Sequence, residues 1–169
     1  MKNKDILLEY LHDMNAFARL KSIACPPIYL LGGSGLILGE YLDRATTDFD
    51  LIDMEYPAST GRLFKMLERF DLLDPFVTPL APGFSERATL LDGFDHLRIN
   101  VLSREDIIVS KLSRYSEKDR SDIDHLIDAC DRKRIAALIE AVMKRTDFSE
   151  RVLMFFRENA VRFREDYHV

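Results

Sequence analysis

Acidic and apolar residues alternate in the segment Thr47-Asp48-Phe49-Asp50-Leu51. Side chains at i and i+2 of a strand point to the same face. Asp48 and Asp50 therefore share one face, while Phe49 and Leu51 share the other. Two carboxylates this close repel each other, so the acidic face is expected to hold a positive partner. A divalent cation is the first candidate.

A glycine turn precedes this strand. Ile28–Leu31 is typical of a short buried strand that runs into Gly32-Gly33, and Ser34 can cap a helix that follows. A strand, a glycine turn and a helix N-terminus together present backbone N–H groups and the positive end of a helix dipole to an anion. Mg²⁺ is often held by one or two carboxylates plus substrate phosphates. The two segments together predict a site for a nucleoside triphosphate with Mg²⁺ or Mn²⁺.

Apolar periodicity and turn residues predict the other elements up to Ser103. The pair Asp92-Gly93 favours a two-residue hairpin turn. The predicted elements are a helix at Ile6–Ala18, a strand at Thr46–Asp53, a helix from Ser59 or Thr60 to Phe70, an irregular connection or short edge strand between Leu72 and Gly83, and hairpin strands at Arg87–Leu91 and Phe94–Leu102.

Beyond Ser103 the pattern is helical throughout, and the spacing of Ser103 and Asp106 resembles a capping box. Four helices are expected, at roughly Arg104–Tyr115, Asp119–Ala129, Arg132–Arg145 and Ser149–Glu165. The fold class is therefore α/β (α+β). A small mixed sheet flanked by helices is expected in residues 1–103, and a helical part in residues 104–169 is expected to pack on that core.

The composition restricts the class of protein. Apolar residues make up 47% of the sequence and the net charge is −5, which argues against a general nucleic-acid coat protein. No run of about 18 uncharged apolar residues is present, so no membrane span is expected. Cys25 and Cys130 lack metal-type spacing, which favours free, buried thiols and a cytoplasmic location.

The spacing of the residues does not match other nucleotide-binding or metal-binding motifs. An EF-hand loop beginning at Asp48 would have Asp53 where glycine is needed and Ser59 where the bidentate glutamate belongs. A P-loop fails because no Gly-Lys-Ser/Thr is present, and the residues after Gly32 lack dinucleotide-binding glycine spacing. The four histidines form no pair at i and i+4.

The combination of Gly32-Gly33-Ser34 and Thr47–Leu51 resembles the signature of the DNA polymerase β-like nucleotidyltransferase superfamily. The later run "LSREDIIVSKLSRYSEKDRSDIDHL" is similar to a segment of minimal nucleotidyltransferases of the abortive-infection toxin type. In that comparison Lys111 matches a lysine that reaches the nucleotide's phosphates. The run "KDRSDI" matches a short acidic helix motif that supports the site. The resemblance covers roughly Ile28 to Leu126.

The resemblance implies a nucleotidyltransferase-like core, two divalent metals and transfer of a nucleotidyl group to a hydroxyl. In relatives the acceptor is an RNA end, a protein or a small molecule, and some relatives act with a cognate partner protein that neutralises them, as in a toxin–antitoxin pair. The implied residues are Asp48 and Asp50 for metal binding and catalysis, and Gly32, Gly33, Ser34, Thr47 and Lys111 for nucleotide binding.

The family's third carboxylate falls near Asn100, which is not ionised. Asp92, Asp95 or Asp122 could serve instead, or the chemistry is weakened or absent. Two functions follow. The first is a metal-dependent nucleotidyltransferase with an atypical third acidic position. The second is a non-catalytic nucleotide-binding or protein-interaction module of the same fold, as one half of a two-protein system.

Overall fold

The computed structural model describes residues 1–169, and the chain divides into two compact units. The first unit comprises Met1–Leu73 and Ala88–Leu102, and the second comprises Asp74–Arg87 and Ser103–Val169. The segment Asp74–Arg87 precedes Ser103 in the sequence but belongs to the second unit. The chain therefore passes from the first unit to the second, returns, and passes again at Ser103.

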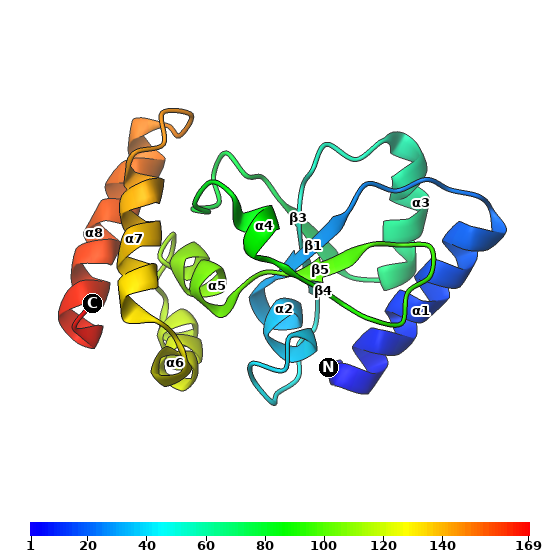
Figure 1. Cartoon of the computed structure of the whole chain (residues 1–169), viewed down its shortest axis with the longest axis horizontal. Coiled ribbons are helices and arrows are strands. Elements are labelled where there is room, and N and C mark those ends of the chain that lie inside the picture. Colours follow the sequence, from blue (N-terminus) through cyan, green and yellow to red (C-terminus); the bar gives the residue numbers. More distant parts are fainter. The chain divides into compact units, whose positions relative to one another are not determined.

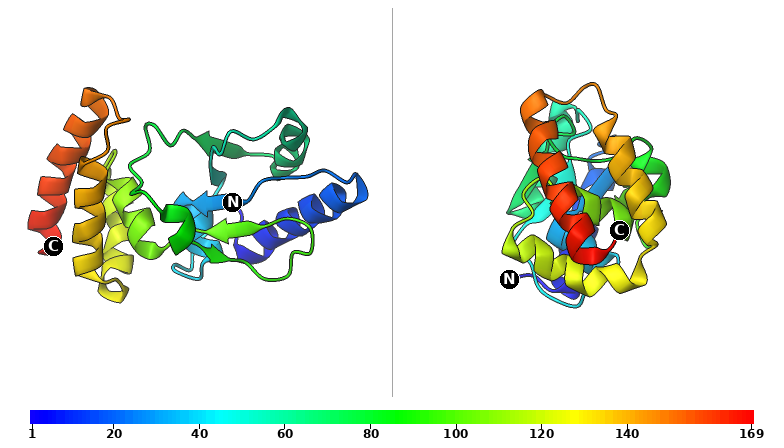
Figure 2. Two further views of the ribbon diagram at one scale, coloured as in Figure 1. Left: turned by 45° about the horizontal axis from the view of Figure 1, so that its top comes forward. Right: turned by 90° about the vertical axis from the view of Figure 1, so that its left-hand side faces the viewer.

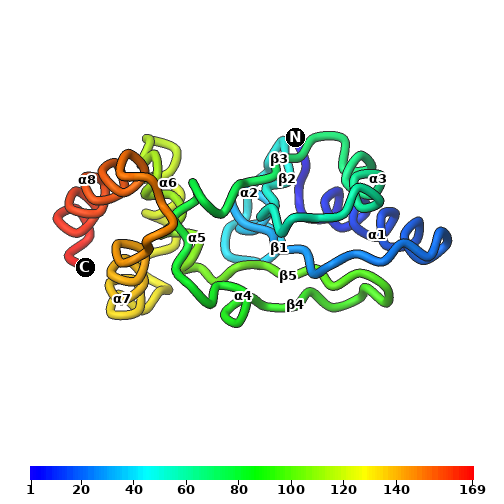
Figure 3. Tube along the Cα trace, turned by 90° about the horizontal axis from the view of Figure 1, so that it is seen from above, coloured from blue at the N-terminus to red at the C-terminus, as the bar shows by residue number.

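A five-stranded mixed sheet forms the centre of the first unit, with the order β3-β2-β1-β5-β4 (Figures 1 and 3). The strand β1 is antiparallel to β2 and parallel to β5, β2 is parallel to β3, and β4 is antiparallel to β5. This arrangement confirms the predicted α/β fold with a small mixed sheet. The strands are β1 Ile28–Leu31, β2 Phe49–Ile52, β3 Phe70–Leu73, β4 Thr89–Leu90 and β5 Ile99–Val101.

Three helices accompany this sheet: α1 Lys4–Leu20, α2 Gly32–Leu38 and the short α3 Gly61–Phe64. Helix α1 begins where the Asn3 side chain accepts the N–H of Ile6, a side-chain cap. Apolar residues of α1, α3 and the sheet form one buried cluster. The apolar face of β2 belongs to it, since Phe49 and Leu51 are both fully buried.

After β2, two local predictions for the first unit are wrong. Residues around α3 do not form one helix through Phe70, because 3-10 turns at Ala58–Thr60 and Lys65–Leu67 flank it and Phe70 begins β3. The strands β4 and β5 do pair, but they are joined by a long loop rather than by a two-residue turn at Asp92-Gly93. That loop is tied to α1, because the Asn15 side chain accepts the N–H groups of His96 and Leu97 and donates to Asp95.

The second unit is helical and includes the segment Asp74–Arg87. Its helices are α4 Phe84–Arg87, α5 Arg104–Lys111, α6 Glu117–Leu126, α7 Arg132–Met143 and α8 Glu150–Tyr167. The side chains of Ser103, Ser116, Asp131 and Ser149 cap α5 to α8. Helices α7 and α8 lie side by side (Figure 2). None of the helices is both long and apolar enough to cross a bilayer.

Two partly buried arginines, Arg87 and Arg145, bind the segment Asp74–Arg87 to the rest of the second unit. Arg87 makes two hydrogen bonds to the carboxylate of Asp106 on α5, of 2.9 and 2.8 Å. Arg145 donates to the backbone carbonyls of Leu80 and Pro75 at 2.9 and 3.0 Å. Paired guanidinium and carboxylate groups of this kind fix geometry strongly, so the segment is an integral part of the second unit.

Candidate active site

The acidic face of β2 lies opposite the buried core. Asp50 is on the strand and Asp48 comes just before it, and both are partly buried. The register pairs Leu31 of β1 with Asp50, so their side chains share a face. Phe49 and Leu51 point into the core on the other face. β2 therefore has the two faces that the alternation predicts, with Asp50 on the polar face, but the strand begins at Phe49 rather than at Thr46, so Asp48 precedes it.

Gly32 allows Asp50 to lie against the glycine turn. The φ angle of Gly32 is +56°, which L side chains rarely adopt, and a Cβ atom there would lie 2.1 Å from Asp50 Oδ2. The same oxygen accepts the backbone N–H of Gly33 at 3.1 Å. The glycine turn thus holds one oxygen of the Asp50 carboxylate in place. Binding of a nucleotide by Gly32 and Gly33 stays a prediction.

Ser34 does not cap a helix, because α2 begins at Gly32 with Leu31 as its N-cap. The Ser34 side chain is fully buried. Its Oγ accepts the N–H of Asp50 at 3.0 Å and donates to the carbonyl of Leu31 at 3.2 Å. These two bonds join α2 to β1 and β2 beside the carboxylate, so Ser34 positions Asp50. Contact between Ser34 and a triphosphate stays a prediction.

Asp48 is held by two neighbours in the first unit. The Thr47 hydroxyl donates to Asp48 Oδ2 at 2.8 Å, and Arg69 Nε lies 3.3 Å from Asp48 Oδ1. The backbone of this segment is also held by Lys2, whose Nζ donates to the carbonyl of Thr47 at 2.9 Å. The two carboxylate oxygens of Asp48 therefore face different partners, Thr47 and Arg69.

Asp71 on β3 is the residue that the sequence analysis missed. The parallel register of β2 and β3 pairs Asp50 directly with Asp71, so both carboxylates project from the same face one strand apart. Asp71 is exposed. The signal in the sequence was the alternation Phe70-Asp71-Leu72, in which an acid stands between apolar residues as in the preceding acidic strand.

Asn100 shares this face but lies farther away. It is on β5 and pairs with Tyr29 of β1, which places β1 between it and Asp50. Two strand spacings amount to about 10 Å. Its side-chain amide is buried and donates to the carbonyl of Ile28 at 3.1 Å. The register therefore offers Asp71 as a nearer third acid, and a catalytic role for Asn100 stays a prediction.

The other acids named as alternatives are not on the strands of the acidic face. Asp95 is in the loop between β4 and β5, and its carboxylate accepts hydrogen bonds from Asn15 and Arg19 of α1. These bonds hold the pKa of the Asp95 carboxyl group below the usual value. Asp92 is an exposed residue of the same loop. Asp122 belongs to the second unit, on α6.

Lys111 lies in a buried ion cluster of the second unit. Its Nζ is 2.7 Å from Asp122 Oδ2 and 3.4 Å from Asp119 Oδ1, and all three side chains are 7% exposed or less. Arg114, which is 77% exposed, reaches Asp119 at 3.3 Å. Lys111 therefore neutralises two carboxylates of the "KDRSDI" run inside the protein. Its predicted contact with nucleotide phosphates stays a prediction.

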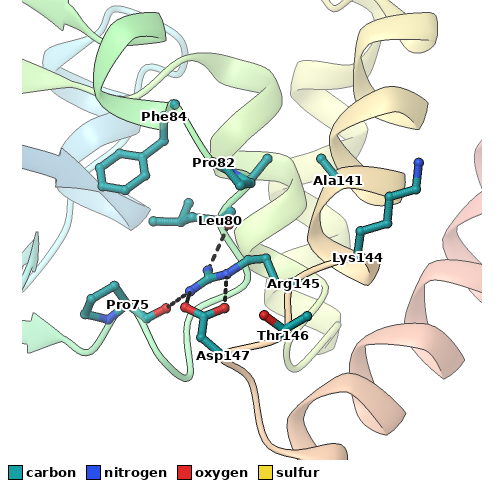
Figure 4. A pocket seen from close by; sticks show the side chains of 11 residues that line it. Pro75, Leu80, Pro82, Phe84, Ala141, Lys144, Arg145, Thr146 and Asp147 are labelled. Carbon is teal, nitrogen blue, oxygen red and sulfur yellow. Dashed lines mark hydrogen bonds and ion pairs between the residues drawn. The ribbon is translucent and has the colours of Figure 1, made fainter.

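The second unit also contains a pocket of ≈ 610 Å³ (Figure 4). Leu80, Pro82 and Phe84 line one side of it and Ala141 and Lys144 the other. The guanidinium of Arg145 is occupied by the carboxylate of Asp147 and two backbone carbonyls. None of the residues predicted as site residues lines this pocket.

The oxygen ligands on the acidic face fit a hard divalent cation. Asp50 on β2 and Asp71 on β3 are register partners, and Asp48 comes just before β2. Carboxylate oxygens are the ligands that Mg²⁺ and Mn²⁺ prefer. No group of three or more His, Cys, Asp or Glu side chains is arranged to hold a metal by itself. Such a set suits an ion that keeps some of its ligands from water or substrate phosphates, as Mg²⁺ usually does.

Comparison with known proteins identifies the family. The family model described as "Nucleotidyltransferase of unknown function (DUF6036)" matches residues 8–164, which is most of the chain and includes all of the acidic face. Neither the search of curated proteins nor the search of solved structures found a match. The family match agrees with the glycine turn and the paired carboxylates of the first unit. The chain belongs to this family of nucleotidyltransferases.

Proposed function

We propose that the protein binds a nucleoside triphosphate with Mg²⁺ or Mn²⁺ and transfers its nucleotidyl group to a hydroxyl of an RNA, a protein or a small molecule. Asp48 and Asp50 hold the metal, and Asp71 is the third carboxylate. The observation that carries this proposal is the register of β2 and β3, which sets Asp71 beside Asp50 on the face opposite the core. The family match supports the reaction class.

Each carboxylate has a distinct task in this proposal. A bound divalent cation would supply positive charge where negative charge develops on the phosphates. Asp50 is held by Gly33 and Asp48 by Thr47, so their oxygens are oriented before the metal arrives. Asp71 is exposed and can meet an incoming acceptor, whose hydroxyl proton it accepts.

In the reaction, one bond to the α-phosphorus forms and one bond breaks. The hydroxyl oxygen of the acceptor forms a bond to the α-phosphorus. The bond from that phosphorus to the oxygen that bridges to the β-phosphate breaks, and pyrophosphate leaves with the bonding electron pair. The proton of the hydroxyl passes to the carboxylate of Asp71. No residue of the chain is covalently modified.

Label transfer tests this proposal. The purified protein is incubated with each α-³²P-labelled nucleoside triphosphate, Mg²⁺ or Mn²⁺, and total cellular RNA and protein. Label should appear in one acceptor class and should be lost in the Asp48→Asn/Asp50→Asn variant. Asp53→Asn, which changes an acid just beyond β2, is the matched control. Absence of label from every acceptor with every triphosphate would contradict the proposal.

The second candidate is a non-catalytic nucleotide-binding or protein-interaction module. The neutral side chain of Asn100, near which the third carboxylate implied by the resemblance falls, favours it. In that case triphosphate and metal together would raise the melting temperature of the protein without any transfer of label.

We also propose that the protein is the toxic half of a pair with a cognate partner protein. The support is the resemblance of the run from Leu102 to Leu126 to nucleotidyltransferases of the abortive-infection toxin type. Expression of the wild type should then arrest growth, and expression of Asp48→Asn/Asp50→Asn should not. Equal growth with both proteins would contradict this assignment.

A further inference from the structure

Arg69 lies beside the acidic face of the first unit. Its Nε is 3.3 Å from Asp48 Oδ1, and its side chain is 71% exposed. The backbone there is fixed, because Glu68 adopts a φ of +63° and the carbonyl of Arg69 accepts the N–H of Phe49 at 3.0 Å. The main chain of Arg69 is therefore held at the start of β3, while its guanidinium remains open to solvent.

The register explains why this cation meets Asp48. Phe49 pairs with Phe70 and Asp50 with Asp71, so one residue earlier Asp48 is opposite Arg69. The acidic face thus consists of two cross-strand pairs. One pair joins two carboxylates, and the other joins a carboxylate to a guanidinium. Cross-strand pairs of opposite charge attract and pairs of like charge repel.

The ion pair between Arg69 and Asp48 can break at a small cost in free energy. Exposed ion pairs contribute little to stability, because water screens both charges and holding the side chains costs entropy. The buried pair of Lys111 and Asp122 in the second unit is different, since breaking it would leave a buried charge. The guanidinium of Arg69 can therefore leave Asp48 at small cost.

A metal and Arg69 compete for the same atom. Asp48 Oδ1 is the oxygen that the guanidinium contacts, and Asp48 is a metal ligand in the proposed function. A bound cation would also repel Arg69. A guanidinium bonds phosphate oxygens in a planar, two-point geometry, and the phosphates of the substrate are the anions that arrive with the metal.

We propose that Arg69 exchanges partners when the site is loaded. In the metal-free protein it neutralises Asp48, and in the loaded site it binds a phosphate of the metal-bound triphosphate. This inference rests on the proposed function and assigns the phosphate-binding cation to the first unit, to a residue of the same face as the carboxylates.

If Arg69 exchanges partners in this way, Arg69→Ala should change the affinity for the metal and the affinity for phosphate in opposite directions. Removing the guanidinium frees Asp48 for the metal, so the affinity for Mn²⁺ alone should increase about two- to fivefold. It also removes a phosphate ligand, so the affinity for inorganic tripolyphosphate in the presence of Mn²⁺ should fall about tenfold. A residue with only a structural role would weaken both.

The experiment measures Mn²⁺ binding by electron paramagnetic resonance of the free ion and tripolyphosphate binding by calorimetry at saturating Mn²⁺. Tripolyphosphate serves as the probe because it needs no knowledge of the base. Arg62→Ala is the matched control, since Arg62 is an exposed cation of α3 in the same unit. Arg69→Lys keeps the charge and should leave the affinity for Mn²⁺ close to that of the wild type. Thermal unfolding of each variant verifies that it is folded.

The outcomes separate this inference from the proposed function. Opposite shifts in Arg69→Ala, with Arg62→Ala unchanged, support the exchange. Shifts of the same sign, no shift, or equal shifts in the control overturn it, and the proposed function then stands if the wild type still binds Mn²⁺ with tripolyphosphate and transfers label. Failure of the wild type to bind Mn²⁺ with tripolyphosphate overturns both.

Discussion

Asp50 of β2 and Asp71 of β3 are register partners in a parallel pair of strands, and their carboxylates project from the same face of the sheet. The two residues are far enough apart in the sequence that no local pattern joins them. Only the pairing of β2 with β3 brings them together, at the edge of the sheet opposite β4. The acidic face therefore has a candidate third acid without any contribution from Asn100.

Substitution of Asp71 distinguishes the two positions for the third acid. Asp71→Asn should lower the rate of nucleotidyl transfer by about 10²- to 10⁴-fold, the usual contribution of a general base. Asn100→Asp should leave the rate unchanged, because Asn100 is separated from Asp50 by β1. Single-turnover transfer of labelled nucleotide measures both. A gain of activity in Asn100→Asp with no loss in Asp71→Asn would assign the third position to residue 100.

Replacement of Gly32 tests whether the turn and Asp50 are one structural unit. Gly32→Ala should lower the free energy of unfolding by about 1–3 kcal/mol, because the left-handed backbone is strained and the new Cβ would overlap Asp50 Oδ2. Gly61→Ala is the control, since nothing lies within 4 Å of a Cβ there, and it should be neutral or stabilising by up to about 1 kcal/mol. Urea unfolding measures both. Equal stability of the two variants would show that the turn accommodates a side chain.

Removal of the buried lysine should destabilise the second unit. Lys111→Met leaves Asp119 and Asp122 without their buried counter-charge, so a loss of about 3–5 kcal/mol is expected. Arg114→Ala removes an exposed partner of Asp119 and should cost about 1 kcal/mol or less. Urea unfolding followed by helical circular dichroism compares them. Unchanged stability of Lys111→Met together with weaker triphosphate binding would instead support the role in phosphate binding that the sequence predicts.

Acid should unfold the second unit through Asp119. Burial opposes ionisation of this carboxyl group, but the hydrogen bond from Ser116 and the charges of Lys111 and Arg114 outweigh it and hold the pKa below the usual 3.8. A lowered pKa in the folded state means that the stabilisation is complete above about pH 4 and is lost as the pH falls further. Urea midpoints measured from pH 6 to pH 2.5 should fall less steeply in Asp119→Asn. Asp128→Asn is the control, because Asp128 is 90% exposed and should follow the wild type.

The sequence was sufficient for features that depend on nearby residues. The alternation of Asp48 and Asp50 correctly predicted an acidic and an apolar face, because the period of a strand requires only successive positions. The helix α1 and the strand β1 were also located correctly, because apolar spacing and the prolines after Cys25 act locally. The capping role of Ser103 followed from spacing in the same way, although the carboxylate of Asp106 accepts from the Ser103 hydroxyl and from Arg87 rather than completing a capping box.

Features that depend on tertiary pairing were not predicted. The strand β3 lies between a segment with helical apolar spacing and the prolines that begin at Pro75, so Asp71 was not recognised. Ser34 was expected to cap a helix, yet its bonding partners are the backbone groups of Leu31 and Asp50, which only the folded sheet brings near. Lys111 meets acids 8 and 11 residues later because the chain turns between α5 and α6 at Tyr115, which has a φ of +51°.

The passage of the chain through Asp74–Arg87 has a consequence for synthesis on the ribosome. This segment is made before β4 and β5 of the sheet, but the guanidinium that binds its Leu80 carbonyl belongs to a residue 65 positions later. The nascent segment must therefore remain exposed until Arg145 has been synthesised. A premature stop between Asp106 and Arg145 would leave the segment without the guanidinium of Arg145, and such fragments are expected to be targets for proteolysis at Phe76 and Val77, which are both 53% exposed even in the completed protein.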